Sequence, residues 1–196
     1  MGEKPSLFNR IAAVYGLFFK WQVRNYRSIF AHVKEELDFT TYQRAIDIGC
    51  GTGALCQALK EYGAEVTGID FAEAMLAIAE KKIPGIRFMR GDVLKGLPFP
   101  DKSFDLAISS YVAHGFMPGE RLLLYQEMSR VARRTAVLID YNEHRSLITD
   151  VAEWLEGGDY FSFIGRVRDE LMQQFGNLKV INTGKRSAMY ICKIKD

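Results

Sequence analysis

Three glycines at alternate positions, Gly49, Gly51 and Gly53, stand in the segment AIDIGCGTGAL at residues 45–55. Glycine weakens a strand interior, so a group of glycines marks a tight bend or a close approach of the backbone to another group. The apolar residues 45–49 predict a short buried strand, and residues 53–63 predict a helix that ends at a glycine. This order is typical of a loop that binds a nucleotide cofactor, because bare backbone can lie against the ligand and the helix offers unpaired N–H groups.

Strands and helices alternate through most of the chain. Four further strands are predicted at 64–70, 86–92, 104–110 and 135–142, with helices at 72–85 and 119–133. This alternation predicts a parallel sheet with helices on both faces. The last two strands, 177–184 and 187–195, are joined by a link too short for a crossover helix and should be antiparallel. The predicted fold is doubly wound, Rossmann-like α/β, with a seven-stranded, mostly parallel sheet and one antiparallel strand near the C-terminus.

Two helical segments flank this pattern. Apolar residues at three-and-four spacing predict a helix over 6–37, with Gly16 as a point where it could break. A second helical segment is predicted at 147–175. We expect residues 1–40 to form a helical cap or lid on a single domain, residues 41–196 to form the cofactor-binding part, and 141–175 to lie on the substrate side.

The composition narrows the class of protein. Of 196 residues, 48% are hydrophobic and 26% charged, a globular balance, and the net charge of +2 gives no reason to expect nucleic acid as a partner. Three scattered cysteines argue against a disulfide framework and against a zinc site. No apolar stretch is long enough to span a membrane and no signal peptide is evident, so a cytoplasmic protein is expected.

An acidic residue ends the strand after the glycine loop. Asp70 closes VTGID about twenty residues after the loop, where a carboxylate can accept hydrogen bonds from both hydroxyls of a ribose. Asp70 could instead cap the helix that follows. The combination of flanked loop and acid is a much stronger sign of a nucleotide cofactor than the glycines alone.

The segments AIDIGCGTGAL, VTGIDFAEAML and FMRGDVLKGLPFPDKSFDLAISSYVAH, with the closing hairpin, resemble the class I S-adenosylmethionine-dependent methyltransferases. The resemblance covers residues 42–141 by motif and extends to 194 by the order of elements. The opening FNRIAAVY is also similar to the start of the methyltransferases of ubiquinone and menaquinone biosynthesis.

The resemblance implies a cofactor, S-adenosylmethionine, a product, S-adenosylhomocysteine, and no metal. The residues that it assigns to cofactor binding are Asp47, Gly49, Gly51 and Gly53 at the methionine end, Asp70 at the ribose, Phe71, Asp92 and Val93 at the adenine, and Ser109 at the sulfonium. Tyr111 would border the sulfonium and the substrate. For Asp92 a solvated turn, and for Tyr111 simple packing, are the alternative interpretations.

Methyl transfer from a sulfonium needs positioning and exclusion of water more than acid–base help. A carbon or nitrogen acceptor must lose a proton, and the candidates for a base are His114, Tyr111, Tyr141 and His144, with His114 and Tyr111 preferred as catalytic residues. The fourth strand is followed by SSYVAH, not by the Asn-Pro-Pro-Tyr or Asp-Pro-Pro-Tyr of enzymes that methylate amino groups of DNA bases and glutamine.

The acceptor is expected to be a small molecule. The N-terminal helix and the segment 141–175 are rich in aromatic residues, which suit an aromatic or apolar acceptor but could instead simply pack the cap on the sheet. Arg10, Lys20, Arg24 and Arg27 beside these aromatics could contact a membrane surface, or they could be a solvated helix face. Two other functions are kept open: a catalytically silent binding protein for S-adenosylmethionine or S-adenosylhomocysteine, and a nicotinamide-dependent oxidoreductase. The spacing Gly-x-Gly-x-Gly disfavours the latter.

Overall fold

A computed structural model describes residues 4–144 and 159–194. The chain divides into two compact units, residues 1–92 and 93–196. Residues 145–158 of the predicted substrate-side segment, Trp154 among them, lie outside the described residues.

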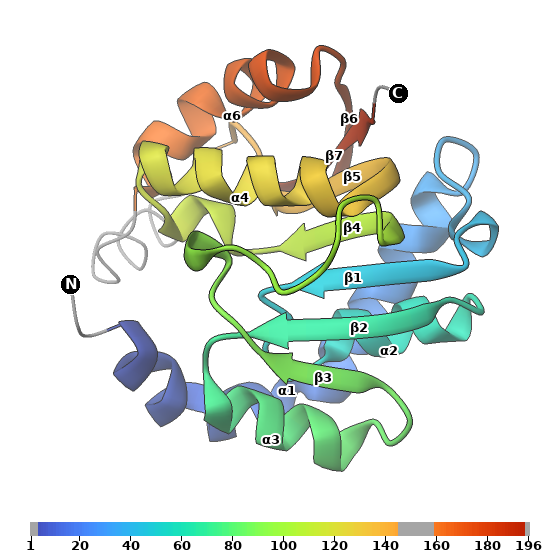
Figure 1. Cartoon of the computed structure of the whole chain (residues 1–196), viewed down its shortest axis with the longest axis vertical. Helices are drawn as coiled ribbons and strands as arrows, with labels where there is room; N and C mark the ends of the chain where they lie inside the picture. Colours follow the sequence, from blue (N-terminus) through green and yellow to red (C-terminus); the bar gives the residue numbers. More distant parts are fainter. Residues whose placement is uncertain (1–3, 145–158, 195–196) are drawn as a thin grey trace. The chain divides into compact units, whose positions relative to one another are not determined.

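The first unit is a three-stranded parallel sheet with three helices (Figure 1). Its elements are α1 (Lys4–Val33), the 3-10 turn η1 (Phe39–Thr41), β1 (Arg44–Ile48), α2 (Ala54–Glu61), β2 (Glu65–Asp70), α3 (Glu73–Lys82) and β3 (Arg87–Arg90). The strand order is β3-β2-β1, and Asp47 is in register with Gly68, and Asp70 with Arg90. Parallel pairing brings the carboxyl ends of these strands to one edge, which is where the glycine loop follows β1.

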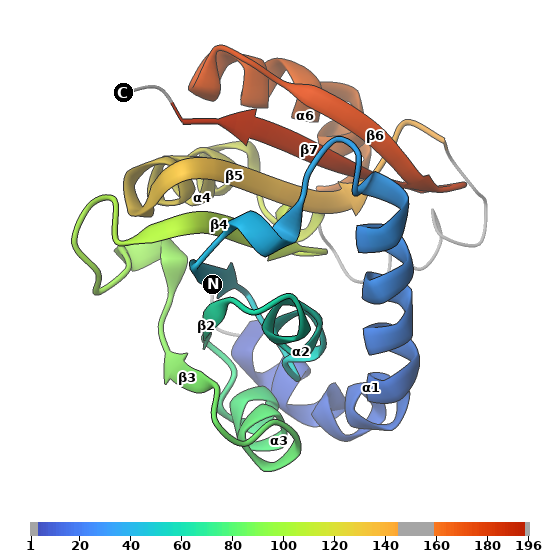
Figure 2. The same cartoon turned by 90° about the vertical axis from the view of Figure 1, so that its right-hand side faces the viewer.

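Helix α1 packs along α2 and α3, and α2 and α3 pack on the strands (Figure 2). The helix is continuous through Gly16, so the break considered from the sequence is wrong. A Cβ on Gly16 would lie 3.5 Å from Ile78 of α3, an ordinary van der Waals distance, so α3 packs beside this part of α1. On the outer side of α1 the side chains of Leu17, Phe18 and Trp21 are exposed, and contact of this helix with a membrane surface stays a prediction.

The second unit holds four strands and two described helices. Its elements are the 3-10 turn η2 (Val93–Lys95), β4 (Phe104–Ser110), the 3-10 turn η3 (Ala113–Gly115), α4 (Pro118–Val131), β5 (Ala132–Tyr141), α6 (Tyr160–Phe175), β6 (Lys179–Gly184) and β7 (Ser187–Lys193). The order is β4-β5-β7-β6, with β4 and β5 parallel and β7 antiparallel to both β5 and β6. Helices α4 and α6 pack on each other, α4 also on β4 and β5, and α6 on β7.

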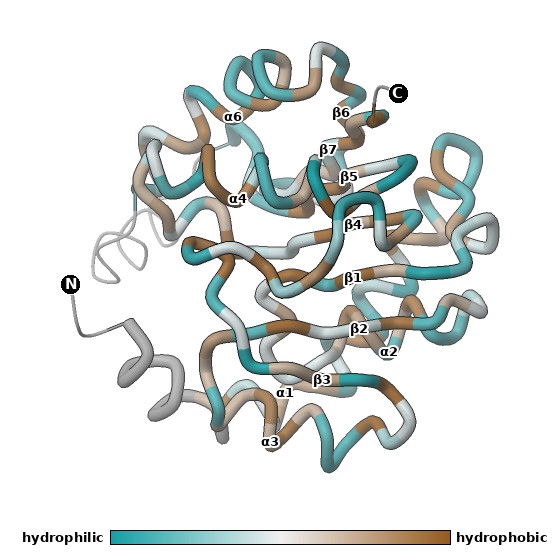
Figure 3. The backbone as a smooth tube through the Cα atoms, viewed as in Figure 1, coloured by the Kyte–Doolittle hydropathy of each residue, from teal (hydrophilic) through white to brown (hydrophobic). Residues whose placement is uncertain are grey.

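The described residues therefore contain the seven strands that the sequence predicts, with β7 as the reversed one. The predicted Rossmann-like, mostly parallel α/β fold is confirmed. Figure 3 shows apolar stretches along β1 and β2. Both strands read as nearly continuous buried runs, as strands covered on both faces do. Among the described residues of both units, no helix is long and apolar enough to cross a membrane.

Candidate functional site

The glycine loop after β1 adopts a conformation that side chains resist. Gly49, Gly51 and Gly53 have φ values of 76°, 52° and 81°, in the left-handed region that glycine enters without steric cost. The N–H groups of Gly49 and Cys50 donate to the carbonyl oxygen of Ile69, at 2.8 and 3.1 Å, and so fix the loop to the end of β2. Gly53 is the N-cap of α2 and has no side chain, so no side-chain cap binds the N–H groups of the first turn of α2.

The glycines differ in what surrounds them. A Cβ on Gly53 would lie 2.8 Å from Ile83 Cδ1, so Gly53 is required by the protein's own packing. A Cβ on Gly51 would meet no atom within 4 Å. The space beside Gly51 is therefore open, as a surface that receives a ligand needs to be.

The carboxylate of Asp70 holds the loop and the start of α3 together. Its Oδ2 accepts from the N–H of Gly51 and its Oδ1 from the N–H of Ala72, both at 2.8 Å. This second bond reaches the N-cap residue Ala72, and α3 itself has no side-chain cap, so the capping role considered from the sequence is not seen. Each oxygen of an ionised carboxylate can accept a second hydrogen bond, so these two bonds and ribose binding are compatible. Burial raises the pKa of Asp70, which donors from a ligand would counteract.

Asp47, near the end of β1, is a buried acid whose bonding is incomplete. Its Oδ2 accepts from the thiol of Cys56 at 3.1 Å, whereas its Oδ1 is buried and has no hydrogen-bond partner among the described residues. Burial raises the pKa of Asp47 from 3.8 to about 7, against the smaller opposite effect of the Cys56 bond. A buried acceptor two residues before a glycine loop, with no donor of its own, fits the amino group of an amino-acid ligand.

The other residues predicted to bind cofactor are placed as follows. Phe71 is half-buried and packs against Ala12 of α1 and Met75 of α3. Asp92 is half-buried just after β3, Val93 is buried at the start of η2, and Ser109 is fully buried near the end of β4. Their roles toward a cofactor stay predictions.

In the second unit the structure brings together Tyr111, His114 and Tyr141, three of the four candidate bases. The ring of Tyr141 lies 4.9 Å from that of His114 and 5.6 Å from that of Tyr111, both edge-on. Tyr111 follows the end of β4 with φ 53°, an uncommon conformation for a residue with a side chain. His144 is exposed two residues after Asn142, and its N–H donates to the side chain of Asn142.

Asp140, which the sequence analysis did not select, lies at the centre of this cluster. Its Oδ1 is 2.7 Å from His114 Nδ1, and its side chain is fully buried. A signal was available, because Asp140 nearly ends its strand in LIDYN as Asp70 ends β2 in VTGID. The sequence does not show that η3 turns the chain so that His114 lies beside Asp140 of β5.

Comparisons with known proteins bear on the loop and on the fold. The family model for a methyltransferase domain matches residues 46–139, which include the glycine loop, Asp47 and Asp70. A demethylmenaquinone methyltransferase from Thermotoga maritima is 33% identical over 141 residues, 71% of this chain. The segment 46–139 is a methyltransferase domain of the class I S-adenosylmethionine-dependent type. The chain spans 56% of the length of that relative.

Solved structures of the superfamily share the fold over nearly the whole chain. A putative S-adenosylmethionine-dependent methyltransferase from Methanococcus maripaludis superposes with a TM-score of 0.73 at 20% identity, covering 96% of this chain and 94% of the other. A Thermotoga maritima structure described as a possible histamine N-methyltransferase gives 0.72 at 20% identity, covering 97% and 99%. At this level of identity the likeness concerns the fold alone.

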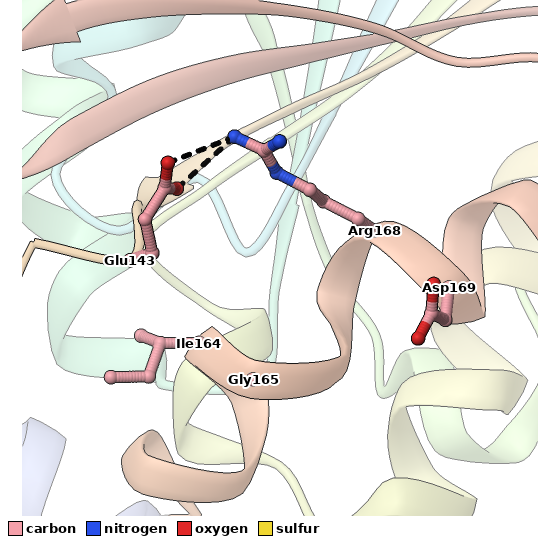
Figure 4. Close-up of a pocket in the computed structure, with 5 residues that line it drawn as sticks. All are labelled: Glu143, Ile164, Gly165, Arg168 and Asp169. Carbon is pink, nitrogen blue, oxygen red and sulfur yellow. Dashed lines mark hydrogen bonds and ion pairs between the residues drawn. The ribbon is translucent and has the colours of Figure 1, made fainter.

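A shallow hollow in the second unit is lined by Glu143, Ile164, Gly165, Arg168 and Asp169 (Figure 4). Arg168 Nη2 donates to both carboxylate oxygens of Glu143 at 3.1 Å, so these two of the three charged lining residues pair with each other. No residue that the superfamily motifs assign to cofactor binding lines the hollow. We give it no role in the chemistry.

The three cysteines are buried and free. Burial raises the pKa of Cys50 to about 11 and that of Cys192 to about 12. Thiols of this kind stay protonated near neutral pH and are poor nucleophiles.

Proposed function

We propose that the protein transfers a methyl group from S-adenosylmethionine to a small-molecule acceptor. The observation that carries the proposal is the buried Oδ1 of Asp47, an acceptor without a donor that stands just before a glycine loop. The amino group at the methionine end of the cofactor is a donor of the required charge. The match of residues 46–139 to a methyltransferase domain supports the same cofactor.

Each residue of the loop region has a proposed task. Asp47 binds the amino group, directly or through water, and Gly51 leaves its backbone bare beside the methionine end. Asp70 binds the ribose hydroxyls with the acceptor sites that the N–H groups of Gly51 and Ala72 leave over. The roles proposed for Gly49, Gly53, Phe71, Asp92, Val93 and Ser109 are those that the resemblance implies.

When bound, S-adenosylmethionine supplies an electrophilic methyl group on a positively charged sulfur. The protein has to hold the acceptor atom in line with that methyl group and keep water away. Tyr111 and His114 are the proposed catalytic residues. They belong to an aromatic cluster that also contains Tyr141, Tyr160 and Phe163, and such a cluster suits a flat or apolar acceptor.

Calorimetric titration with S-adenosylmethionine and S-adenosylhomocysteine, with NADH as a control, tests the proposal. We expect micromolar binding of the two sulfur compounds and none of NADH. An acceptor screen that begins with quinols and phenols then separates an enzyme from a silent binding protein, which would bind the cofactor and turn over nothing. Failure of the folded protein to bind either sulfur compound would overturn the proposal, and binding of NADH would favour an oxidoreductase.

A further inference from the structure

The carboxylate of Asp140 accepts three backbone N–H groups and also lies within hydrogen-bond distance of the His114 ring. Its Oδ1 is 2.8 Å from the N–H of Tyr141 and 2.7 Å from His114 Nδ1, and its Oδ2 is 3.1 and 3.4 Å from the N–H groups of Ala113 and His114. The side chain of Asp140 is 0% exposed. Three backbone donors around one buried carboxyl group suit an ionised carboxylate, whose two oxygens have acceptor sites for all of them and for the imidazole.

This arrangement decides which nitrogen of the His114 imidazole carries the hydrogen. Asp140 Oδ1 can only accept, so Nδ1 of His114 carries a hydrogen and the basic lone pair of neutral His114 lies on Nε2. The same carboxylate also binds the backbone of η3, so the ring and the turn that carries it are held by one group.

Ring packing adds a second restraint. The rings of Tyr141, Phe163 and Tyr111 stand edge-on to His114 with centroids at 4.9, 6.4 and 6.5 Å. The groups that face the imidazole therefore include Asp140 and Tyr141 of β5, Tyr111 of the preceding turn and Phe163 of α6. The His114 side chain keeps 11% of its surface exposed, so it is held but not closed off from solvent.

The turn that carries His114 also stores backbone strain. Tyr111 has φ 53°, and its N–H donates to the carbonyl of Ile139 at 2.9 Å, which ties the turn to β5. Strain of this kind persists where the surroundings enforce it, and it gathers at functional sites. The turn follows the carboxyl end of β4, the end at which ligands bind in sheets of this class.

We propose that Asp140 is a positioning residue that makes His114 a general base, and that the acceptor is a molecule with a weakly acidic hydroxyl group. This inference rests on the proposed methyl transfer. The acceptor O–H bond breaks and its proton passes to His114 Nε2. The oxygen electron pair forms the new O–CH₃ bond as the C–S bond breaks, and the electron pair of that bond stays on sulfur. The products are the methyl ether, neutral S-adenosylhomocysteine and protonated His114, which later releases its proton to solvent.

A base of this kind distinguishes acceptor classes. A hydroxyl oxygen becomes a good nucleophile only as its proton leaves, so a base adds about two to four orders of magnitude to the rate. A neutral amine attacks with its lone pair and loses its proton only after the methyl group has been transferred, and a thioether has no proton to lose. The His114–Asp140 pair is therefore of use for a hydroxyl and of little use for the other two.

The variants that test the inference are Asp140→Asn and His114→Asn. In Asp140→Asn an amide can donate to Nδ1 and move the imidazole proton to Nε2. In His114→Asn the amide N–H₂ can still donate to Asp140, so a structural bond is kept while the base is removed. The imidazole tautomer is read by nitrogen NMR of the S-adenosylhomocysteine-saturated protein, and turnover is read with catechol and 4-hydroxybenzoate against benzylamine.

We expect the wild-type protein to hold the Nδ1–H tautomer and to methylate hydroxyl probes alone. Asp140→Asn should reverse the tautomer and lower kcat about a hundredfold or more. His114→Asn should lower kcat similarly and abolish the fall in rate at low pH. S-adenosylhomocysteine affinity should be unchanged in both variants.

A wild-type Nε2–H tautomer, or unchanged turnover in His114→Asn, would overturn the inference. Turnover of benzylamine alone, or of none of the probes, would do the same. Failure of the wild-type protein to bind S-adenosylhomocysteine would instead overturn the proposed function, and the calorimetric titration by itself reveals that outcome. If Asp140→Asn fails to fold, the wild-type tautomer and His114→Asn still decide.

Discussion

Asp70 Oδ2 accepts a hydrogen bond from the backbone N–H of Gly51 at 2.8 Å, across nineteen positions of the chain. The bond joins the end of β2 to the middle of the glycine loop. It makes the acid that is proposed to bind ribose also the group that shapes the loop for the methionine end. Ligands that carry only part of the cofactor should therefore separate the effect of a change at Asp70 from that of a change at Asp47.

Adenosine carries the ribose and the base of the cofactor but no amino-acid end. Asp70→Asn should weaken the binding of both adenosine and S-adenosylhomocysteine about tenfold, or about 1.4 kcal/mol, because a charge-assisted acceptor is lost. Asp47→Asn should weaken S-adenosylhomocysteine alone. Calorimetry with the two ligands checks this, and equal losses of adenosine in both variants would contradict the assignment of Asp47 to the amino group.

Gly51→Ala tests the open space beside the loop. The left-handed backbone should cost roughly 1 kcal/mol of stability, and the new methyl group should occupy the place of the ligand. Gly63→Ala is the matched control, since Gly63 also has a positive φ and open surroundings but follows α2. We expect similar melting temperatures for the two variants and loss of S-adenosylhomocysteine binding in Gly51→Ala alone. Normal binding by Gly51→Ala would place the ligand elsewhere.

The raised pKa of Asp47 predicts a pH-dependent cost to the fold. In the unfolded chain this carboxyl ionises near 3.8 and in the folded protein near 7, so folding favours its protonated form. Its contribution is most favourable below pH 4, falls as pH rises, and is lost above pH 7. The loss amounts to roughly 4 kcal/mol. Urea unfolding of the wild-type protein and Asp47→Asn at pH 5 and pH 8 measures it, and we expect the variant to gain stability relative to the wild type at pH 8. A difference that does not vary with pH would contradict the prediction.

A buried arginine should dominate the stability of the second unit. Arg121 of α4 is 0% exposed and binds Glu170 of α6 through two nitrogens, at 2.8 and 2.7 Å, and Asp159 at 2.9 Å. Without Arg121 the two partly buried carboxylates of Asp159 and Glu170 lose their positive partner, so Arg121→Ala should lower the free energy of unfolding by about 3 kcal/mol or more. Arg168→Ala breaks an exposed pair with Glu143 and should cost less than about 0.5 kcal/mol. Chemical unfolding compares them, and equal costs would contradict this account.

The sequence alone determined the succession of strands and helices along the chain, the place of the glycine loop and the choice of Asp70. These depend on local patterns: the spacing of apolar residues, the conformations open to glycine and the position of an acid at a strand end. It also selected His114 and Tyr111. Their catalytic roles, like the contacts of Phe71, Asp92, Val93 and Ser109 with a cofactor, stay predictions.

Only the tertiary structure decided which of these residues meet. Gly16 lies inside the continuous helix α1 and beside Ile78 of α3, a neighbour that no local pattern contains. Asp140 reaches His114 because η3 turns the chain back across the parallel pair of β4 and β5, 26 positions away in sequence. Asp47 has an unpartnered oxygen only because the surrounding residues bury it. Burial and long-range pairing depend on how the elements pack, and packing is a property of the whole fold.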